Sequence, residues 1–266
     1  MEIGLIKEVL EAQVLVGEEQ LATEVEHVYA SDLMSDVLAF GRPNSILLTG
    51  LATQQAAISA HMAEFKGVVF IRGKRPKDGA EKFAREHQLV LLGTALDMFE
   101  ACIRIESPVS RPAAPPETDV GQPWTDGILL SKEFSVQGGD FAGGGLVSTE
   151  VKSLLKTIGF DSRLVRRVAI CTYEGEMNVI MHALRGKVGL TVTPQVVAVV
   201  IDDQGKGIPD VELAMQRGFS TATEEMRAMG FGSGLGLSNI KNNADDLTIQ
   251  SEVGQGTTVS MRFFTK

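Results

Sequence analysis

The 266-residue chain has only two cysteines, no long apolar run and no excess of basic residues. Cys102 and Cys171 lie far apart and form no CxxC or Cys/His cluster, which argues against a disulfide scaffold and gives no zinc signature. We expect both to be buried free thiols in a reducing compartment. No apolar segment reaches the roughly 18 residues of a membrane helix, and the first residues lack the pattern of a secretory signal. The sequence therefore predicts a cytoplasmic protein without membrane contact.

Acidic residues outnumber basic ones by 34 to 25, which gives a formal net charge of −9. Proteins that hold nucleic acids neutralise phosphates with clustered Lys and Arg, so this balance argues against a nucleic-acid partner. Hydrophobic residues make up 44% of the chain and charged residues 22%, which is a globular composition. The length is sufficient for two domains, each with its own core.

Proline is concentrated in one segment: five of the nine prolines lie in residues 106–123, with few large apolar residues between them. Such a segment is typical of a semi-extended linker. It divides the chain into an N-terminal domain, residues 1–105, and a C-terminal domain, residues 124–266.

The N-terminal domain alternates short apolar runs with helix-like segments. Apolar runs lie at 46–50, 68–71 and 89–93, and helical patterns at 31–40, 53–65, 78–87 and 94–103. Continuously apolar strands between helices are typical of a parallel sheet covered on both faces. We therefore predict a mainly parallel α/β fold.

The C-terminal domain has a different pattern, in which strands follow one another without intervening helices. We expect strands at 128–136, 187–193, 196–202, 246–252 and 257–264, and helices at 147–158, 161–184, 210–216 and 235–244. Asp161 should cap the second helix, and a hairpin should turn near residues 193–195. These elements predict an α/β sandwich with a mostly antiparallel sheet and helices on one face.

Residues 230–237 read Gly-Phe-Gly-Ser-Gly-Leu-Gly-Leu and precede a helical pattern. Small residues there would let backbone N–H groups approach an anion at the start of a helix; a flexible glycine linker is the alternative. All three Gly-x-Gly frames fail the Rossmann pattern, and no Gly-Lys pair fits a P-loop. A nucleotide site built on these glycines must belong to another architecture.

A second glycine-rich stretch, residues 138–145, lies between the first strand and the first helix of the C-terminal domain. We interpret it as a connecting loop. A second anion site is the alternative.

Glu174, Asn178 and His182 are spaced to lie on one face of a helix. An Asn oxygen is a suitable ligand for Mg²⁺, which takes waters and phosphate oxygens as its other ligands. A carboxylate one turn away can accept a proton during attack on a phosphate. Taken alone, the same spacing is also typical of a solvated helix face, and His182 could pack instead of lining a site.

A strand predicted at 196–202 runs into Asp203-Gln204-Gly205-Lys206-Gly207. A carboxylate just past the strand can accept a hydrogen bond from the amino group of adenine, and the glycines would let the backbone lie flat under the base. An ordinary turn is the alternative. Residues 254–258, Gly-Gln-Gly-Thr-Thr, enter the last predicted strand and are informative only through their place in this order of motifs.

In this order the four motifs resemble the GHKL ATP-binding superfamily, which includes gyrase, MutL and the histidine kinases, over residues 125–266. The chain is most similar to the anti-sigma-factor serine/threonine kinase branch, on residues 174–183, 218–222 and 230–237. The resemblance implies the Bergerat α/β sandwich, with ATP and Mg²⁺ as cofactors. It implies the following roles: Glu174 as general base, Asn178 on the metal, Asp203 on adenine with Gly205 and Gly207 beneath it, Gly232, Gly234 and Gly236 as the phosphate loop, residues 218–231 as a lid, and Thr257, or alternatively Thr258, on the adenine side.

The N-terminal domain resembles the DRTGG domain, on residues 31–38, 46–51 and 68–74, although the Asp-Arg-Thr-Gly-Gly string itself is missing. We interpret it as a sensor or dimerisation module. Homodimerisation is a further expectation of the resemblance.

Three functions are compatible with these motifs. The first is a regulatory kinase that phosphorylates a serine or threonine of a partner protein. The second is an ATP-gated binding module with little or no phosphate transfer. The third is a metabolic ATPase or small-molecule kinase, for which the sequence shows no second substrate pocket.

Overall fold

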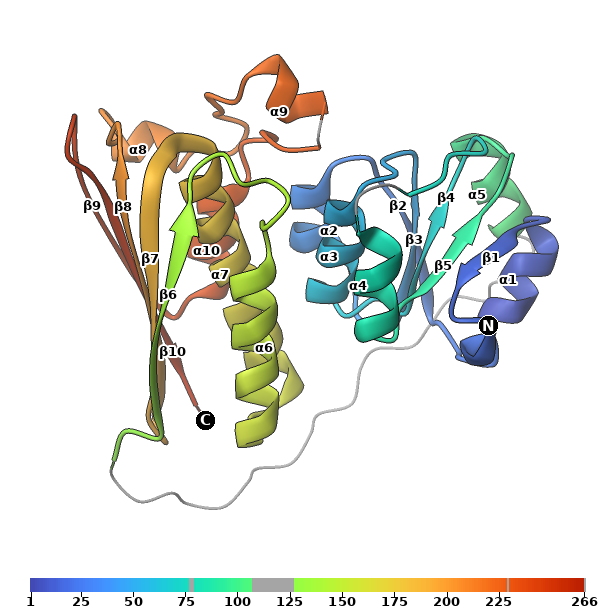
Figure 1. Cartoon of the computed structure of the whole chain (residues 1–266), viewed down its shortest axis with the longest axis horizontal. Coiled ribbons are helices and arrows are strands. Elements are labelled where there is room, and N and C mark those ends of the chain that lie inside the picture. The colour runs from blue at the N-terminus through green and yellow to red at the C-terminus, as the bar shows by residue number, and fades with distance from the viewer. Residues whose placement is uncertain (77–78, 107–126, 229, 266) are drawn as a thin grey trace. The chain divides into compact units, whose positions relative to one another are not determined.

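The computed structural model describes residues 1–76, 79–106, 127–228 and 230–265 (Figure 1). They form two units, one mainly from before the proline-rich segment and one mainly from after it. Apart from Glu106, the predicted linker at 106–123 lies outside the described residues. No helix in the described part of the chain is long and apolar enough to cross a bilayer.

The N-terminal unit is built on a five-stranded sheet of order β1-β5-β4-β3-β2, in which β2 to β5 are parallel and β1 is antiparallel to β5. The strands are β1 (Gln13–Val16), β2 (His27–Ala30), β3 (Ser45–Thr49), β4 (Gly67–Phe70) and β5 (Val90–Gly93). The helices are α1 (Ile3–Val9), α2 (Met34–Phe40), α3 (Gln54–Met62), α4 (Ala80–Glu86) and α5 (Met98–Glu106), with a 3₁₀ turn at Glu18–Gln20. The prediction of a mainly parallel α/β fold is confirmed.

Helices cover both faces of this sheet (Figure 1). On one face, Ile3 and Ile6 of α1 and Ile105 of α5 are in one buried cluster with Ile46 of β3 and Val69 of β4. The three central strands are buried along almost their whole length, which explains why they are continuously apolar in sequence.

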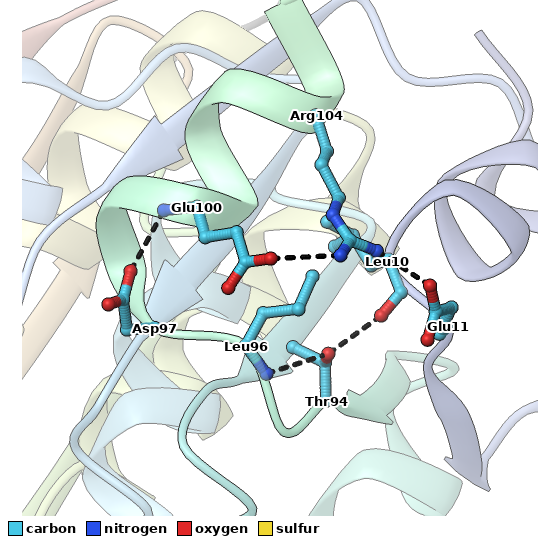
Figure 2. Close-up of polar contacts among 7 residues, drawn as sticks. All are labelled: Leu10, Glu11, Thr94, Leu96, Asp97, Glu100 and Arg104. Atoms are coloured by element: carbon cyan, nitrogen blue, oxygen red, sulfur yellow. Dashed lines mark hydrogen bonds and ion pairs between the residues drawn. The ribbon is translucent and has the colours of Figure 1, made fainter.

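Polar contacts join α1, β5 and α5 at one end of the unit (Figure 2). The buried hydroxyl of Thr94 donates to the carbonyl of Leu10 at 2.7 Å, so it satisfies a carbonyl at the end of α1. Arg104 pairs with Glu11 and Glu100, each at 2.8 Å. Because these carboxylates are exposed, we expect the buried Thr94 contact to contribute more to stability than either ion pair.

The C-terminal unit has a five-stranded, fully antiparallel sheet of order β6-β7-β8-β10-β9. The strands are β6 (Leu130–Gln137), β7 (Ala183–Val192), β8 (Val196–Gly205), β9 (Asp246–Glu252) and β10 (Gly256–Phe264). The helices are α6 (Leu146–Ile158), α7 (Ser162–His182), α8 (Val211–Ala214), α9 (Glu224–Ala228) and α10 (Gly236–Asn243). Three of them, α6, α7 and α10, lie on one face of the sheet, which confirms the predicted sandwich (Figure 1).

Local signals predicted in the sequence fix the ends of these elements. The Asp161 side chain accepts a hydrogen bond from the N–H of Leu164 at 3.0 Å and so caps α7 as expected. Val192 and Val197 are paired across the β7–β8 hairpin, so the turn lies at residues 193–195. Of the two free cysteines, Cys171 is buried on α7, whereas Cys102 is partly exposed on α5; the expectation of two buried thiols is therefore wrong for Cys102.

The first turn of α6 is capped by a carboxylate from α7. Glu176 is 1% exposed, and its Oε1 accepts from the N–H groups of Gly145 and Val147 at 2.9 and 3.2 Å, while its Oε2 accepts from the N–H of Ser148 at 2.9 Å. Burial raises the pKa of Glu176, and these N–H donors oppose that rise. Since the chain's own carboxylate occupies this helix start, residues 138–145 are a connecting loop, and the alternative of a second anion site is not supported.

Replacing Glu176 with alanine should destabilise the protein strongly. The change leaves two buried N–H donors and one partly buried N–H donor without their acceptor, and we expect it to lower the free energy of unfolding by about 2–4 kcal/mol. Glu150→Ala is the matched control, because Glu150 is an exposed carboxylate on α6 that pairs with Lys132. Its expected cost is below about 1 kcal/mol. Urea unfolding of the full chain measures both changes, and equal costs would contradict the capping role.

Candidate functional site

The predicted helix face carries two polar groups of different burial. Glu174 is 5% exposed and Asn178, one turn later on α7, is half-buried. Burial raises the pKa of Glu174 to about 7, and a hydrogen bond from Asn239 opposes that rise. A carboxyl group with this pKa changes its protonation state near neutral pH, as a general base requires. His182 is the last residue of α7 and is exposed.

The start of α10 meets this helix face at Gly236. A Cβ built on Gly236 would lie 3.2 Å from Glu174 Oε2 and 3.6 Å from Asn178 Oδ1. The backbone of the phosphate-loop candidate therefore lies close to both predicted side chains, and a larger residue at 236 would crowd them. The structure thus brings together residues from two separate motifs, Glu174 and Asn178 of α7 and Gly236 of α10.

The glycine-rich loop before α10 is held by the segment at 218–219. The N–H of Gly218 donates to the carbonyl of Gly234 at 3.0 Å. Gly234 has a φ of +72°, and a Cβ there would overlap the backbone of Gly218. Both the left-handed backbone and the close approach therefore require glycine at this position. Gly232 also has positive φ.

Two features of this loop fit an anionic ligand. The N-cap residue of α10 is Leu235, which makes no side-chain cap hydrogen bond, and the first N–H groups of a helix have no intrahelical partner. Within the described residues, the Ser233 hydroxyl is shielded from solvent and has no hydrogen-bond partner. An unpaired buried hydroxyl is costly, and a phosphate oxygen would be a suitable acceptor. Ser233 was not singled out in the sequence, because nothing there shows that its hydroxyl is buried.

The adenine-side candidates lie on neighbouring strands. Asp203 of β8 is paired with Thr257 of β10, so both side chains lie on the same face of the sheet. That face is covered by helices, because Val199 and Ile201 alternate with Asp203 along β8 and are buried. Asp202 and Thr258 share the opposite face, where the Thr258 hydroxyl donates to Asp202 at 2.6 Å. The strand register therefore favours Thr257 over Thr258 as the adenine-side threonine.

Burial raises the pKa of Asp203, and the neighbouring charge of Asp202 adds to the rise. Backbone N–H groups of Gly205 and Thr257 donate to the carboxylate and oppose it. Gly205 lies beside this carboxylate. Gly207, with a φ of +70°, is packed so closely against the carbonyl of Glu252 on β9 that a Cβ would overlap it. The last glycine of the Asp-x-Gly-x-Gly loop is thus packed against the backbone at the end of β9.

Hydrogen bonds of Ser251 on β9 connect the residue after the Asp-x-Gly-x-Gly loop to the start of β10. Its Oγ accepts from the N–H of Ile208 at 2.7 Å, donates to the carbonyl of Gly256 at 3.0 Å and lies 2.8 Å from Thr257 Oγ1. A serine hydroxyl has one hydrogen, and either hydroxyl of the Ser251–Thr257 pair can be the donor; when Ser251 donates to the Gly256 carbonyl, Thr257 donates to Ser251. Thr257 is then left with acceptor capacity only. The sequence did not indicate Ser251, since its partner Ile208 is 43 positions away.

Comparison with known proteins places these motifs in a family. Residues 168–266 match the model of the histidine kinase-, DNA gyrase B- and HSP90-like ATPases. An anti-sigma F factor of Caldanaerobacter subterraneus subsp. tengcongensis is 37% identical over 93 residues, which are 33% of this chain and 62% of the relative. The serine/threonine-protein kinase RsbT of Bacillus subtilis is 33% identical over 98 residues, 37% of this chain and 62% of the relative. An anti-sigma F factor of Geobacillus stearothermophilus is 32% identical over 114 residues, 43% of this chain and 67% of the relative.

Two solved structures show partial likeness at 15% identity. One contains the CBS and DRTGG domains of the regulatory region of a Clostridium perfringens pyrophosphatase, with a TM-score of 0.34, covering 39% of this chain and 45% of that one. The other contains the RsbU and RsbW domains of Rv1364c from Mycobacterium tuberculosis, with a TM-score of 0.35, covering 50% of this chain and 31% of that one. The chain spans 62% of the length of the first two sequence relatives. Through its C-terminal unit, the chain belongs to the family of histidine kinase-, DNA gyrase B- and HSP90-like ATPases.

Proposed function

We propose that this protein binds Mg·ATP and transfers the γ-phosphate to a serine or threonine hydroxyl of a partner protein. The observation that supports this most directly is the meeting of Glu174, Asn178 and Gly236. A candidate base, a candidate metal ligand and the start of a phosphate-loop helix lie close together there. The relatives named as anti-sigma F factors and as a serine/threonine-protein kinase support the same class of function.

Each part of the proposed site has a role for a part of the nucleotide. Asp203 would accept from the amino group of adenine, with Thr257 as a second acceptor and Gly205 and Gly207 below the base. The N–H groups of the loop at Gly232, Gly234 and Gly236 would face the phosphates. These roles use the acceptors and N–H donors at the end of the sheet and at the start of α10.

Asn178 would hold Mg²⁺ through its side-chain oxygen. A single protein oxygen is sufficient, because Mg²⁺ takes phosphate oxygens and waters as its remaining ligands. When bound, the metal would offset the negative charge of the phosphates. Glu174 Oε2 would take the proton of the attacking hydroxyl. The hydroxyl oxygen of the partner would then form its bond to the γ-phosphorus as the bond from that phosphorus to ADP breaks.

The remaining parts of the chain would regulate this reaction. We assign residues 1–105 to a DRTGG-like sensor or dimerisation domain, joined through residues 106–123 to the ATP-binding domain at 124–266. The protein would act as a homodimer, in the cytoplasm, where ATP and the partner are available.

A second candidate function is an ATP-gated switch without phosphate transfer. The hydrogen bond from Gly218 to Gly234 favours it, because it joins the proposed lid to the phosphate loop. Nucleotide on the loop could then change the order of the lid and so a partner-binding surface. This function needs no general base, whereas the kinase function does.

Comparison of phosphoproteomes in the native host would separate the two functions. Cells that carry the wild-type chain are compared with cells that carry Glu174→Gln at equal abundance. We expect one or a few serine or threonine sites on a partner protein to lose phosphate in the variant. Unchanged phosphorylation together with unchanged control of the partner would favour the switch over the kinase.

A further inference from the structure

One buried polar contact joins α10 to the candidate base on α7. Asn239 Nδ2 donates to Glu174 Oε1 at 2.7 Å, and the two residues are 2% and 5% exposed. They are 65 positions apart in sequence. Nothing in the motifs assigns a role to Asn239.

This contact gives the two oxygens of the Glu174 carboxylate different surroundings. Oε1 is occupied by the amide of Asn239. Oε2 is the oxygen near Gly236, whose Cβ position would also be close to Asn178 Oδ1. The oxygen that remains available therefore lies beside the proposed metal ligand and the start of α10.

We propose that Asn239 is a positioning residue that fixes the Glu174 carboxylate so that Oε2, and not Oε1, takes the proton in phosphate transfer. The inference rests on the proposed function, because it requires Glu174 as the base. Rotation of the carboxylate would break a charge-assisted hydrogen bond in a buried site, where such bonds are strong. The carboxylate is thus held in one orientation before the substrate arrives, which removes a reorganisation cost from the reaction.

The place of Asn239 in the fold also ties the base to the phosphate loop. Its backbone N–H donates to the carbonyl of Leu235 at 2.7 Å, so it belongs to the first turn of α10. Phosphates seated on the loop before Gly236 would steady this turn and, with it, the Asn239 amide. The same bond favours the ionised form of Glu174, because an N–H donor stabilises a carboxylate.

The chain offers a matched control on the same helix. Asn243 Nδ2 donates instead to the backbone carbonyl of Asn239 at 2.9 Å and so stabilises α10 through the helix backbone. Asn239→Ala and Asn243→Ala both remove one amide from α10. They should differ in catalysis if Asn239 acts through Glu174.

The first test is a double-mutant cycle on phosphate transfer to the partner identified by phosphoproteomics. Asn239→Ala should lower kcat about 10- to 100-fold with little change in the Kd for Mg·ATP, and Asn243→Ala should change neither. In a Glu174→Gln background, Asn239→Ala should cause no further loss. Full additivity would show that Asn239 acts independently of Glu174 and would overturn the inference.

The second test needs no phosphate transfer, so it separates failure of this inference from failure of the proposed function. In the ¹⁵N-labelled full chain, one side-chain amide proton of Asn239 should be shifted downfield by the carboxylate. Glu174→Gln should move that signal and leave the Asn243 amide unchanged. An Asn239 signal that does not respond to Glu174→Gln overturns the inference, even if the wild-type chain is an active kinase.

Discussion

Glu174→Gln should leave the Kd for Mg·ATP within about threefold of wild type and lower the rate of phosphate transfer by about 10²- to 10⁴-fold. Glutamine has nearly the same shape, and its amide oxygen can still accept from Asn239 in place of Oε1. The group at the Oε2 position becomes an NH₂ group, which cannot take a proton from the attacking hydroxyl. Single-turnover transfer of labelled phosphate, with nucleotide affinity measured on the same samples, gives both quantities.

The pH dependence of transfer gives an independent check on this residue. The pKa of Glu174 lies near 7, raised from 4.5 by burial. Only the ionised carboxylate can accept a proton, so transfer in the wild type should rise with pH through this range and level off above it. The residual activity of Glu174→Gln should lack this rise. A variant that retains wild-type transfer and its pH profile would exclude Glu174 as the base.

Asp203→Asn should weaken Mg·ATP binding by about 10- to 100-fold. The Asp203 carboxylate accepts from the N–H groups of Gly205 and Thr257 and retains capacity to accept from adenine. An amide has one oxygen, so the variant loses either the backbone donors or the adenine amino group. Competition against a fluorescent ATP analogue measures the change.

Asp202→Asn is the control for this prediction. Asp202 is the preceding residue on β8, but it lies on the opposite face of the sheet and is bonded to Thr258. Its replacement should leave the Kd for ATP within about twofold, because an exposed polar contact contributes little. Equal losses in the two variants would mean that net charge, and not the predicted adenine contact, governs binding.

The fold was predictable where the sequence pattern is strong. Continuous apolar runs identified β3, β4 and β5, because those strands are buried on both faces. The edge strands β1 and β2 have four residues each and are only partly buried, so their patterns are too short and too mixed to stand out. The short helix α9 (Glu224–Ala228) was not predicted either; it lies inside residues 218–231, which the resemblance indicates as a lid.

The candidate site was predictable only as far as its residues lie in contiguous motifs. Glu174 and Asn178 share a helix face, and Asp203 follows a strand, so local spacing indicated them. Asn239 and Ser251 act through partners 65 and 43 positions away, and only the packing of α10 on α7 and of β9 on the Asp-x-Gly-x-Gly loop creates those contacts. The choice of Thr257 over Thr258 likewise depends on the register of β8 and β10.

Titration of the wild-type chain with Mg·ATP by calorimetry, with Mg·GTP as the comparison, tests the central claim most directly. Asp203 presents a carboxylate acceptor, and Thr257 presents a second acceptor when it donates to Ser251; acceptors match the amino group of adenine and repel the carbonyl oxygen that guanine has at the same position. We predict saturable binding of one ATP per chain, at least about tenfold tighter than GTP. A folded chain that binds neither nucleotide, or that binds both equally, would contradict the assignment of this end of the sheet as an adenine site.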